Sequence, residues 1–288
     1  MSIQLSICIC TRNRPEDLEK ALISIEQSTI PAFEVIVSDD STDLRTRDLV
    51  ASKFPQTVFI EGPRKGLGPN RNHVLQRAAG THLLFMDDDM ELGTECIERL
   101  NRRLNQVEAA RRDKAILTGI EYGRNNDKVY PKDQSFLGYQ TKLYNRSEGL
   151  NTLVIGSAIF PRGLFQMVRF DEQLVYGYDE VDISTRAVKS GYEIILCEQA
   201  FITHNSSPVN RDYYKPVIEA SRFYVTYKRY TYTEKLPVKG WIFFSLACCH
   251  LLLSDLKHKG LPGLKDARKT METSLTYIRN YRQTEAGR

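Results

Sequence analysis

A short apolar segment that runs into three consecutive carboxylates places the strongest constraint on the fold. Residues 83–86 have the length of a buried strand, and Asp87, Asp88 and Asp89 follow them directly. Three like charges in a row repel one another unless a cation neutralises them. In open α/β sheets, ligands bind outside the carboxyl ends of strands, where this triplet would lie. Two interpretations follow: a site for a divalent metal with a phosphorylated ligand, or a solvated acidic turn.

Strand and helix patterns alternate through the first part of the chain. The strand-like segments are residues 5–10, 33–38, 57–61 and 83–86, and the helix-like segments between them include 15–27 and 69–79. Such alternation is typical of a parallel sheet with right-handed crossovers. We therefore predict an α/β fold with a mostly parallel central sheet flanked by helices.

Polar side chains follow three of these four predicted strands. They are Thr11, Asn13, Asp39, Asp40, Asp87 and Asp89. Because the carboxyl ends of parallel strands meet at one edge of a sheet, we expect these side chains to lie close together. Hydrogen-bond donors and acceptors can bind the base and ribose of a nucleotide, and carboxylates can bind a metal ion on its diphosphate. The strand ends together favour the metal-site interpretation of the acidic triplet.

Composition excludes several classes of protein. The chain has 288 residues, is 41% hydrophobic and 26% charged, and carries a net charge of only +4, so nucleic acid is not expected as a partner. Gly66 and Gly68 lack the third glycine and the acidic partner of a dinucleotide-binding fingerprint. The six cysteines show no metal-binding spacing, and residues 2–10 lack a signal-peptide pattern. We expect reduced thiols and a cytoplasmic location.

Two acidic residues and one histidine in the second half are further candidates. Asp179 and Glu180 precede a helix that ends near Gly191, and His204 follows the last predicted strand. Carboxylates in a first turn can stabilise the helix start, or one of them can act as a general base. A lone histidine is more often structural than a ligand. The residues alone leave these alternatives open. Residues 121–150 are polar and Tyr-rich with little periodicity, which predicts an irregular functional segment.

The order of these segments resembles the family 2 glycosyltransferases, inverting enzymes with the GT-A nucleotide-sugar fold. The matching segments are SICICTRNRP, VIVSDDSTD, GLGPNRNHVLQRAAGTHLLFMDDD, FDE with YGYDEVD and the trailing SGYEIIL, and His204. They occur in order from residue 5 to about residue 205. The resemblance implies a GT-A catalytic domain at 1–205 and a helical C-terminal extension at 206–288. Within the domain, residues 1–110 would bind the nucleotide and 111–205 the acceptor.

The resemblance also implies a role for each candidate. The nucleotide is expected at Thr11, Asn13, Asp39, Asp40, Arg71 and Asp87. Asp87 and Asp89 match the first and last residues of a DxD motif, with Asp87 toward the ribose. A Mn²⁺ or Mg²⁺ ion is expected at Asp89, Asp87 and His204. For the catalytic base, position favours Glu180 and chemistry also permits Asp179. Asp88 is expected to be the member of the triplet whose substitution matters least.

The activity implied is metal-dependent, inverting transfer of a sugar from a nucleotide-diphospho-sugar to an acceptor hydroxyl. The donor would be a UDP-, GDP- or dTDP-sugar and the acceptor a glycan or a lipid-linked glycan, in polysaccharide or glycan biosynthesis. Two alternatives remain. One is a catalytically silent nucleotide-sugar-binding or scaffold protein, and the other is a metal-dependent nucleotidyltransferase.

Residues 241–256 form the most apolar helical segment, followed by Lys257, His258 and Lys259. The apolar stretch is shorter than a membrane-spanning helix, so no span is expected. The segment can pack on the catalytic domain, join a second subunit, or lie on an anionic membrane as an interfacial helix. The last alternative would place the protein at the inner face of the membrane. Lys and Arg outnumber Asp and Glu by about two to one over residues 211–288.

Overall fold

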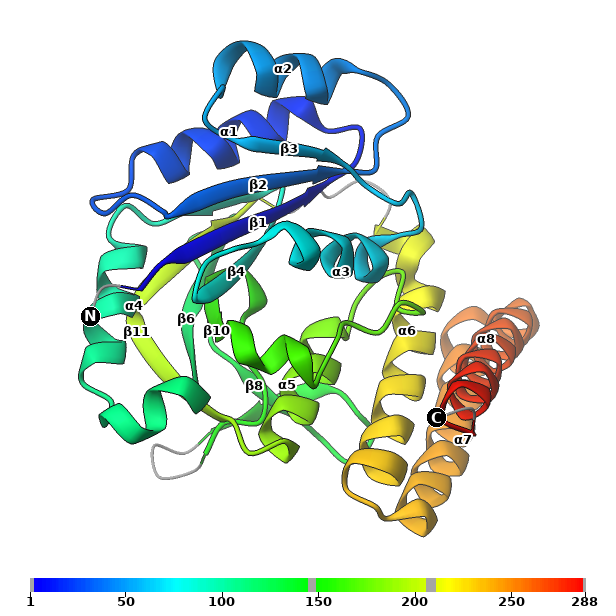
Figure 1. Ribbon diagram of the computed structural model, residues 1–288. Coiled ribbons are helices and arrows are strands. Elements are labelled where there is room, and N and C mark those ends of the chain that lie inside the picture. The colour runs from blue at the N-terminus through cyan, green and yellow to red at the C-terminus, as the bar shows by residue number, and fades with distance from the viewer. Residues whose placement is uncertain (1–2, 145–148, 206–210, 287–288) are drawn as a thin grey trace.

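A nine-stranded mixed sheet runs through the molecule, with strand order β3-β2-β1-β4-β10-β6-β11-β5 and with β7 paired to β6 (Figure 1). The computed structural model describes residues 3–144, 149–205 and 211–286. Helices cover both faces of the sheet, and the last three helices stand to one side of it. The α/β architecture expected from the alternating pattern is confirmed.

The first half of the sheet is parallel, as predicted. Its strands are β1 (Leu5–Thr11), β2 (Glu34–Asp39), β3 (Val58–Glu61) and β4 (His82–Asp87), connected by helices α1 (Pro15–Glu26), α2 (Arg45–Lys53) and α3 (Leu67–Arg77). β1 lies between β2 and β4. Its register pairs Thr11 with Asp39 and Cys10 with Asp87, so the polar strand ends lie at one level of the sheet.

The second half of the sheet is mixed. Its elements are β5 (Met90–Leu92), α4 (Cys96–Asn105), η1 (Ala109–Lys114), β6 (Ala115–Gly123), η2 (Ile155–Ser157), β10 (Ala158–Pro161), η3 (Arg162–Gln166), α5 (Asp179–Lys189) and β11 (Glu193–His204). β10 runs antiparallel to β4 and β6, whereas β11 runs parallel to β6 and antiparallel to β5. The central position of β10 gives a mixed sheet, which the strand pattern alone does not specify.

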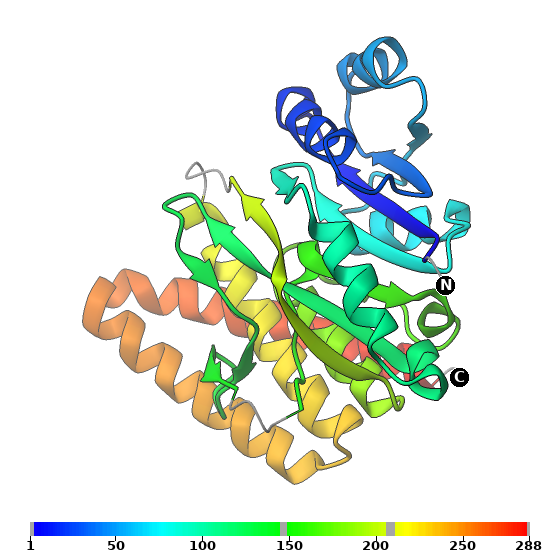
Figure 2. The same cartoon turned by 90° about the vertical axis from the view of Figure 1, so that its left-hand side faces the viewer.

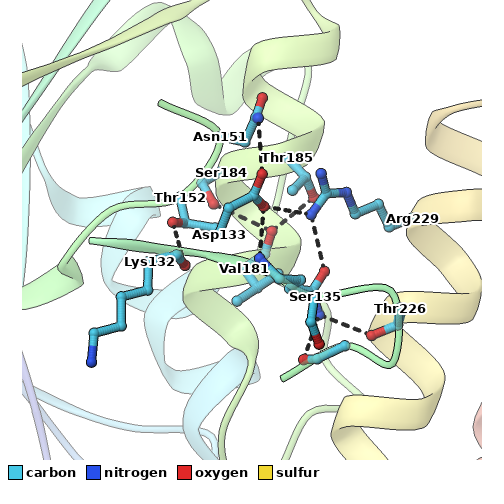
Figure 3. A network of polar contacts seen from close by, with 12 residues as sticks. Lys132, Asp133, Ser135, Asn151, Thr152, Val181, Ser184, Thr185, Thr226 and Arg229 are labelled. Atoms are coloured by element: carbon cyan, nitrogen blue, oxygen red, sulfur yellow. Dashed lines mark hydrogen bonds and ion pairs between the residues drawn. The ribbon is translucent and has the colours of Figure 1, made fainter. Parts of the chain in front are cut away.

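The segment 121–150 is more ordered than its sequence indicated. It contains β7 (Lys128–Val129) and an antiparallel hairpin of β8 (Lys132–Gln134) and β9 (Gln140–Leu143); residues 145–148 lie outside the described residues. Asp133 accepts hydrogen bonds from Asn151 and from the Arg229 guanidinium, and Gln134 donates to Thr226 (Figure 3). The segment is therefore partly regular, because its anchors come from residues elsewhere in the chain.

Two apolar cores lie on opposite faces of the sheet. Because side chains alternate along a strand, Ile7 and Ile9 join the core under α1 and α4, whereas Cys8 joins the core under α3 and α5. Phe85 of β4 lies in the second core, with edge-to-face contacts to Phe165 and Phe170. These cores hold the strand ends rigidly in place.

The C-terminal helices are α6 (Arg211–Lys228), the π-helical turn η4 (Arg229–Thr233), α7 (Pro237–Lys259) and α8 (Leu261–Ala286). They share a third core with the start of α5, to which Val181 and Phe223 belong. A buried ion pair, Lys228 Nζ to Asp182 Oδ1 at 2.9 Å, ties α6 to α5. Helices α7 and α8 lie beyond α6, away from the sheet (Figures 1 and 2).

Helix α7 is longer than its apolar stretch indicated. It has 23 residues and is long and apolar enough to cross a membrane by length and composition. The prediction that no segment reaches this length is therefore wrong, because the helix begins before and ends after residues 241–256. Core helices of soluble proteins pass the same test.

Candidate active site

Three strand ends meet at one edge of the sheet, and they carry the acidic triplet and its neighbours. β1 ends at Thr11, β2 at Asp39 and β4 at Asp87, with β1 paired to both of the others. β11 brings His204 to the same edge, where its ring approaches Asp89. The structure therefore groups residues from the two halves of the sequence.

Asp88 is the most buried of the three carboxylates. The Thr11 hydroxyl donates to its Oδ2 at 2.8 Å, and Arg14 Nη1 lies 2.8 Å from its Oδ1. Burial raises the pKa of Asp88 to about 7, and the positive charge of Arg14 only partly opposes this. Asp88 thus connects the end of β4 to the end of β1 and to Arg14, just before α1; its expected minor importance among the three stays a prediction. The hydroxyl proton of Thr11 is therefore used in the hydrogen bond to Asp88.

Asp89 and His204 form a pair with ligand-like geometry. His204 Nε2 lies 3.3 Å from Asp89 Oδ1, and its Nδ1 lies 3.1 Å from Glu121 Oε1. Burial lowers the pKa of His204, but the bonds to the two carboxylates outweigh burial and raise it to about 10. Arg14 Nη1 approaches the other Asp89 oxygen at 3.1 Å. The positive charges of Arg14 and His204 thus balance the negative charges of Asp88 and Asp89.

The donor set at Asp89 and His204 fits a divalent cation shared with a phosphorylated ligand. Within the described residues, no group of three or more His, Cys, Asp or Glu side chains could hold a metal alone. An oxygen and an imidazole nitrogen leave most coordination positions to phosphate oxygens and water, as Mg²⁺ and Mn²⁺ prefer. Metal-binding histidines usually donate their other ring N–H to a carboxylate, and Glu121 occupies this position at Nδ1 of His204.

Arg71 is buried and bonded to two carboxylates. Its Nη2 lies 2.8 Å from Asp87 Oδ1, and its Nη1 is bonded to Asp179 on α5. The guanidinium also stacks near the Phe170 ring, 5.4 Å from its centre. Its Nε is buried without a hydrogen-bond partner among the described residues. Arg71 thus links β4 to α5, and its contact with the nucleotide stays a prediction.

Asp179 and Glu180 have different surroundings although they are neighbours. Asp179 is 8% exposed and neutralised by Arg71. Glu180 is partly exposed, and its side chain interacts with its own backbone N–H and with the Gln140 side chain of β9. Burial raises the pKa of Glu180, while the Gln140 hydrogen bond and the more distant Arg71 charge oppose the rise. Only Glu180 therefore combines access with a raised proton affinity.

The remaining predicted nucleotide residues support the loops beside the strand ends. Asp39 accepts a hydrogen bond from the Ser41 backbone at 2.9 Å, and burial raises its pKa although Ser41 opposes this. Asp40 Oδ1 accepts from the Arg64 backbone N–H at 2.7 Å. Asn13 has a left-handed backbone, with φ of 56°, and its Oδ1 accepts from the backbone of residue 42 at 2.9 Å. The side chains of Asp40 and Asn13 therefore stabilise the loops beside the strand ends.

Three residues of the site were missed from the sequence. Arg14 lies three residues after Thr11, the end of the first strand. A positive charge at this place could have been recognised as a partner for the acidic triplet. Glu121 approaches His204 because β6 pairs with β11. Gln140 approaches Glu180 from the β8–β9 hairpin. The sequence carried no local pattern for the last two, since Glu121 depends on the pairing of β6 with β11 and Gln140 on a hairpin anchored by Thr226 and Arg229.

Comparisons with known proteins identify the family and the fold. The sequence model of glycosyl transferase family 2 matches residues 6–168. A GalNAc(5)-diNAcBac-PP-undecaprenol beta-1,3-glucosyltransferase of Campylobacter jejuni is 32% identical over 108 residues, which cover 36% of this chain and 35% of that enzyme. The match thus spans about a third of this relative's length.

Two solved structures share the fold. TarS 1–349 of S. aureus in complex with UDP superposes with a TM-score of 0.53 at 18% identity, covering 98% of this chain and 92% of that one. GalNAc-T7 with UDP, GalNAc and Mn²⁺ gives a TM-score of 0.59 at 15% identity, covering 90% and 59%. The fold is the GT-A fold of glycosyltransferases, with a helical C-terminal region. Since the family model matches more than half of its residues, the chain belongs to glycosyl transferase family 2 and is a glycosyltransferase.

Proposed function

We propose that this chain is a metal-dependent, inverting glycosyltransferase that moves a sugar from a nucleotide-diphospho-sugar to an acceptor hydroxyl in polysaccharide or glycan biosynthesis. One observation carries the proposal. Glu180, a partly exposed carboxylate, lies in the first turn of α5, which Arg71 joins to the strand end at Asp87 through Asp179. A proton acceptor thus stands opposite the strand ends that would hold the donor.

The donor would lie across the strand ends in the nucleotide-binding half, residues 1–110. Asp39 would face the base, and the Asp87 carboxylate, one oxygen of which is taken by Arg71, would turn the other to the ribose. Asp89 and His204 would hold Mn²⁺ or Mg²⁺, which supplies Lewis-acid neutralisation of the diphosphate leaving group. UDP is the first nucleotide to test, before GDP and dTDP, because both structural neighbours contain it.

Glu180 would take the proton of the acceptor hydroxyl as its oxygen attacks the anomeric carbon. A carboxylate with a raised pKa is a stronger base, which favours this step near neutral pH. One in-line displacement inverts the anomeric configuration and requires no enzyme nucleophile. Asp179 would be a positioning residue, since Arg71 neutralises its charge.

The acceptor would bind in the half formed by residues 111–205, and it would be a glycan or a lipid-linked glycan. The name of the Campylobacter relative includes an undecaprenol-linked glycan, which supports a lipid-linked acceptor. We place the reaction in the cytoplasm, at the inner face of the membrane when the acceptor is lipid-linked. Residues 206–288 would form the helical extension.

Thermal shift with UDP, GDP, dTDP and ATP, each with and without Mn²⁺, tests the donor class. Stabilisation by one nucleoside diphosphate that requires Mn²⁺ supports the proposal, because a ligand of the folded state raises Tm. A preference for the triphosphate would indicate nucleotidyl transfer. Slow metal-dependent hydrolysis of the matching sugar nucleotide, absent in Glu180→Gln, would distinguish an enzyme from a silent binding protein.

A further inference from the structure

Helix α7 has an apolar outer face. The stripe consists of Val238, Ile242, Leu246, Cys249, Leu253 and Leu256, each three or four residues after the one before. Val238 is 71% exposed and Leu253 is 69% exposed, while Ile242 and Leu246 are each 50% exposed. At about 1.5 Å per residue, the α7 stripe extends for roughly 27 Å. Exposed apolar side chains in a continuous row of this length mark a docking surface.

The opposite face of α7 is already occupied. Phe243, Phe244, Ala247 and Leu251 are buried in the third core, against α6 and α8. Phe243 and Phe244 make edge-to-face contacts with Phe223 of α6. A helix held in this way presents one apolar face only, which suits a peripheral surface.

The charges around the α7 stripe are predominantly positive. Residues 234–269 contain seven Lys and Arg against three Asp and Glu, and Lys239 is paired with Glu234. Lys259 is paired with Asp255 and Asp266, whereas Lys235 and Lys257, at the two ends of the helix, have no ion-pair partner in the part of the chain that the structure describes. A second copy docking through the same face would bring like charges together. An anionic surface would instead complement them.

The α7 stripe borders the side of the molecule proposed to receive the acceptor. The His250 ring lies 6.1 Å from the ring of Tyr139, which is in the hairpin loop between β8 and β9. The next residue, Gln140, is the hydrogen-bond partner of Glu180. Only a few residues therefore separate the surface of α7 from the proposed base.

We propose that the α7 stripe docks this protein on an anionic phospholipid bilayer, with the apolar side chains in the interface and Lys235 and Lys257 at the headgroups. The surface does not depend on the chemistry of transfer. It adds a partner to the proposed function, because a bilayer at this position would present a lipid-linked acceptor to the side of the enzyme that carries Glu180.

Co-sedimentation of the full chain with vesicles tests the proposal. Vesicles of phosphatidylcholine with phosphatidylglycerol should bind the protein, vesicles of phosphatidylcholine alone should bind it at least about tenfold more weakly, and high salt should reduce binding. The double substitution Leu246→Glu with Leu253→Glu should lower partitioning by about tenfold or more. Lys235→Gln with Lys257→Gln should weaken binding to anionic vesicles alone.

Met167→Glu is the matched control, because Met167 is 65% exposed and lies outside the α7 stripe. It should bind vesicles like the wild type. Failure of the wild type to bind anionic vesicles, or binding unchanged by Leu246→Glu with Leu253→Glu, would overturn the proposal. So would a dimer in light scattering that this double variant converts to a monomer, since the occupant would then be a second copy.

Folding of the variants and donor binding are checked separately by the Mn²⁺-dependent thermal shift with UDP. A protein that binds anionic vesicles but shows no nucleotide shift and no transfer would overturn the proposed function and leave the bilayer surface standing. A protein that transfers sugar to a soluble acceptor but does not bind vesicles would overturn the bilayer surface and leave the proposed function standing. The two proposals therefore fail independently.

Discussion

Arg71 on α3 and Asp179 at the start of α5 form a buried ion pair between residues 108 positions apart in the chain. The same guanidinium bonds Asp87 at the end of β4. The pair therefore fixes the start of α5 relative to the strand end proposed to hold the ribose. It also neutralises Asp179, which favours Glu180 as the proposed base.

Glu180→Gln should lower the rate of sugar transfer by about 10²- to 10⁴-fold, because the amide cannot accept the proton of the acceptor hydroxyl. Donor-nucleotide binding, measured by calorimetry, should stay within about twofold, since Glu180 lies on the acceptor side. Glu198→Gln, at an exposed position on β11, is the control. Full turnover in Glu180→Gln would show that the base is another residue.

Asp179→Asn should destabilise the fold by about 3 kcal/mol, because it leaves the buried Arg71 with a single carboxylate. Urea unfolding of the single variants and of Asp179→Asn with Arg71→Met gives the coupling free energy of the pair. A coupling near zero would mean that the ion pair does not hold α5. Retained stability together with complete loss of transfer would instead make Asp179 the base.

Asp88 should produce a pH dependence of stability. Its folded pKa of about 7 lies above the ordinary 3.8, so the folded state holds the proton more tightly than the unfolded state does. Its contribution is fully present below about pH 4 and is lost as pH rises through 7. The free energy of unfolding of the wild type, compared with Asp88→Asn in chelator, should fall across this window by at most about 4 kcal/mol. A difference independent of pH would contradict the buried position of Asp88.

Glu121→Gln should weaken Mn²⁺ binding by about 10- to 100-fold, because the carboxylate orients His204 through its Nδ1 and makes Nε2 a better ligand. Calorimetric titration of Mn²⁺ in the presence of UDP measures the effect without turnover. Glu95→Gln, an exposed helix-start residue, should change nothing. Equal affinity in both variants would remove Glu121 from the metal-binding arrangement.

Gln140→Leu should move the acid limb of the activity profile to higher pH. The Gln140 hydrogen bond stabilises the ionised form of Glu180 and so lowers its pKa, against the rise caused by burial. Without that bond the pKa rises further, and a higher pH is needed to produce the active carboxylate. The ratio kcat/KM measured from pH 5 to about 9 reports the limb. A shift toward lower pH would reverse the sign of this argument.

Much of the fold and of the strand-end cluster could be predicted because the signals are local. The strand segments and the first helices follow from apolar periodicity, and the strand ends carry Asp39 and Asp87 within a few residues of the apolar runs. The antiparallel placement of β10 and the β8–β9 hairpin were not predicted. Their conformations depend on partners elsewhere in the chain, such as Arg229 for Asp133, for which no local pattern exists.

The sequence by itself determined the α/β class, the acidic strand end at Asp87–Asp89 and the inclusion of His204 among the candidates. Only the tertiary structure decided that Asp179 is paired with Arg71, and that one face of α7 is exposed while the other is buried. The physical reason is that periodicity and strand ends are properties of neighbouring residues. Neutralisation, burial and exposure depend on which distant side chains fill the space around a group.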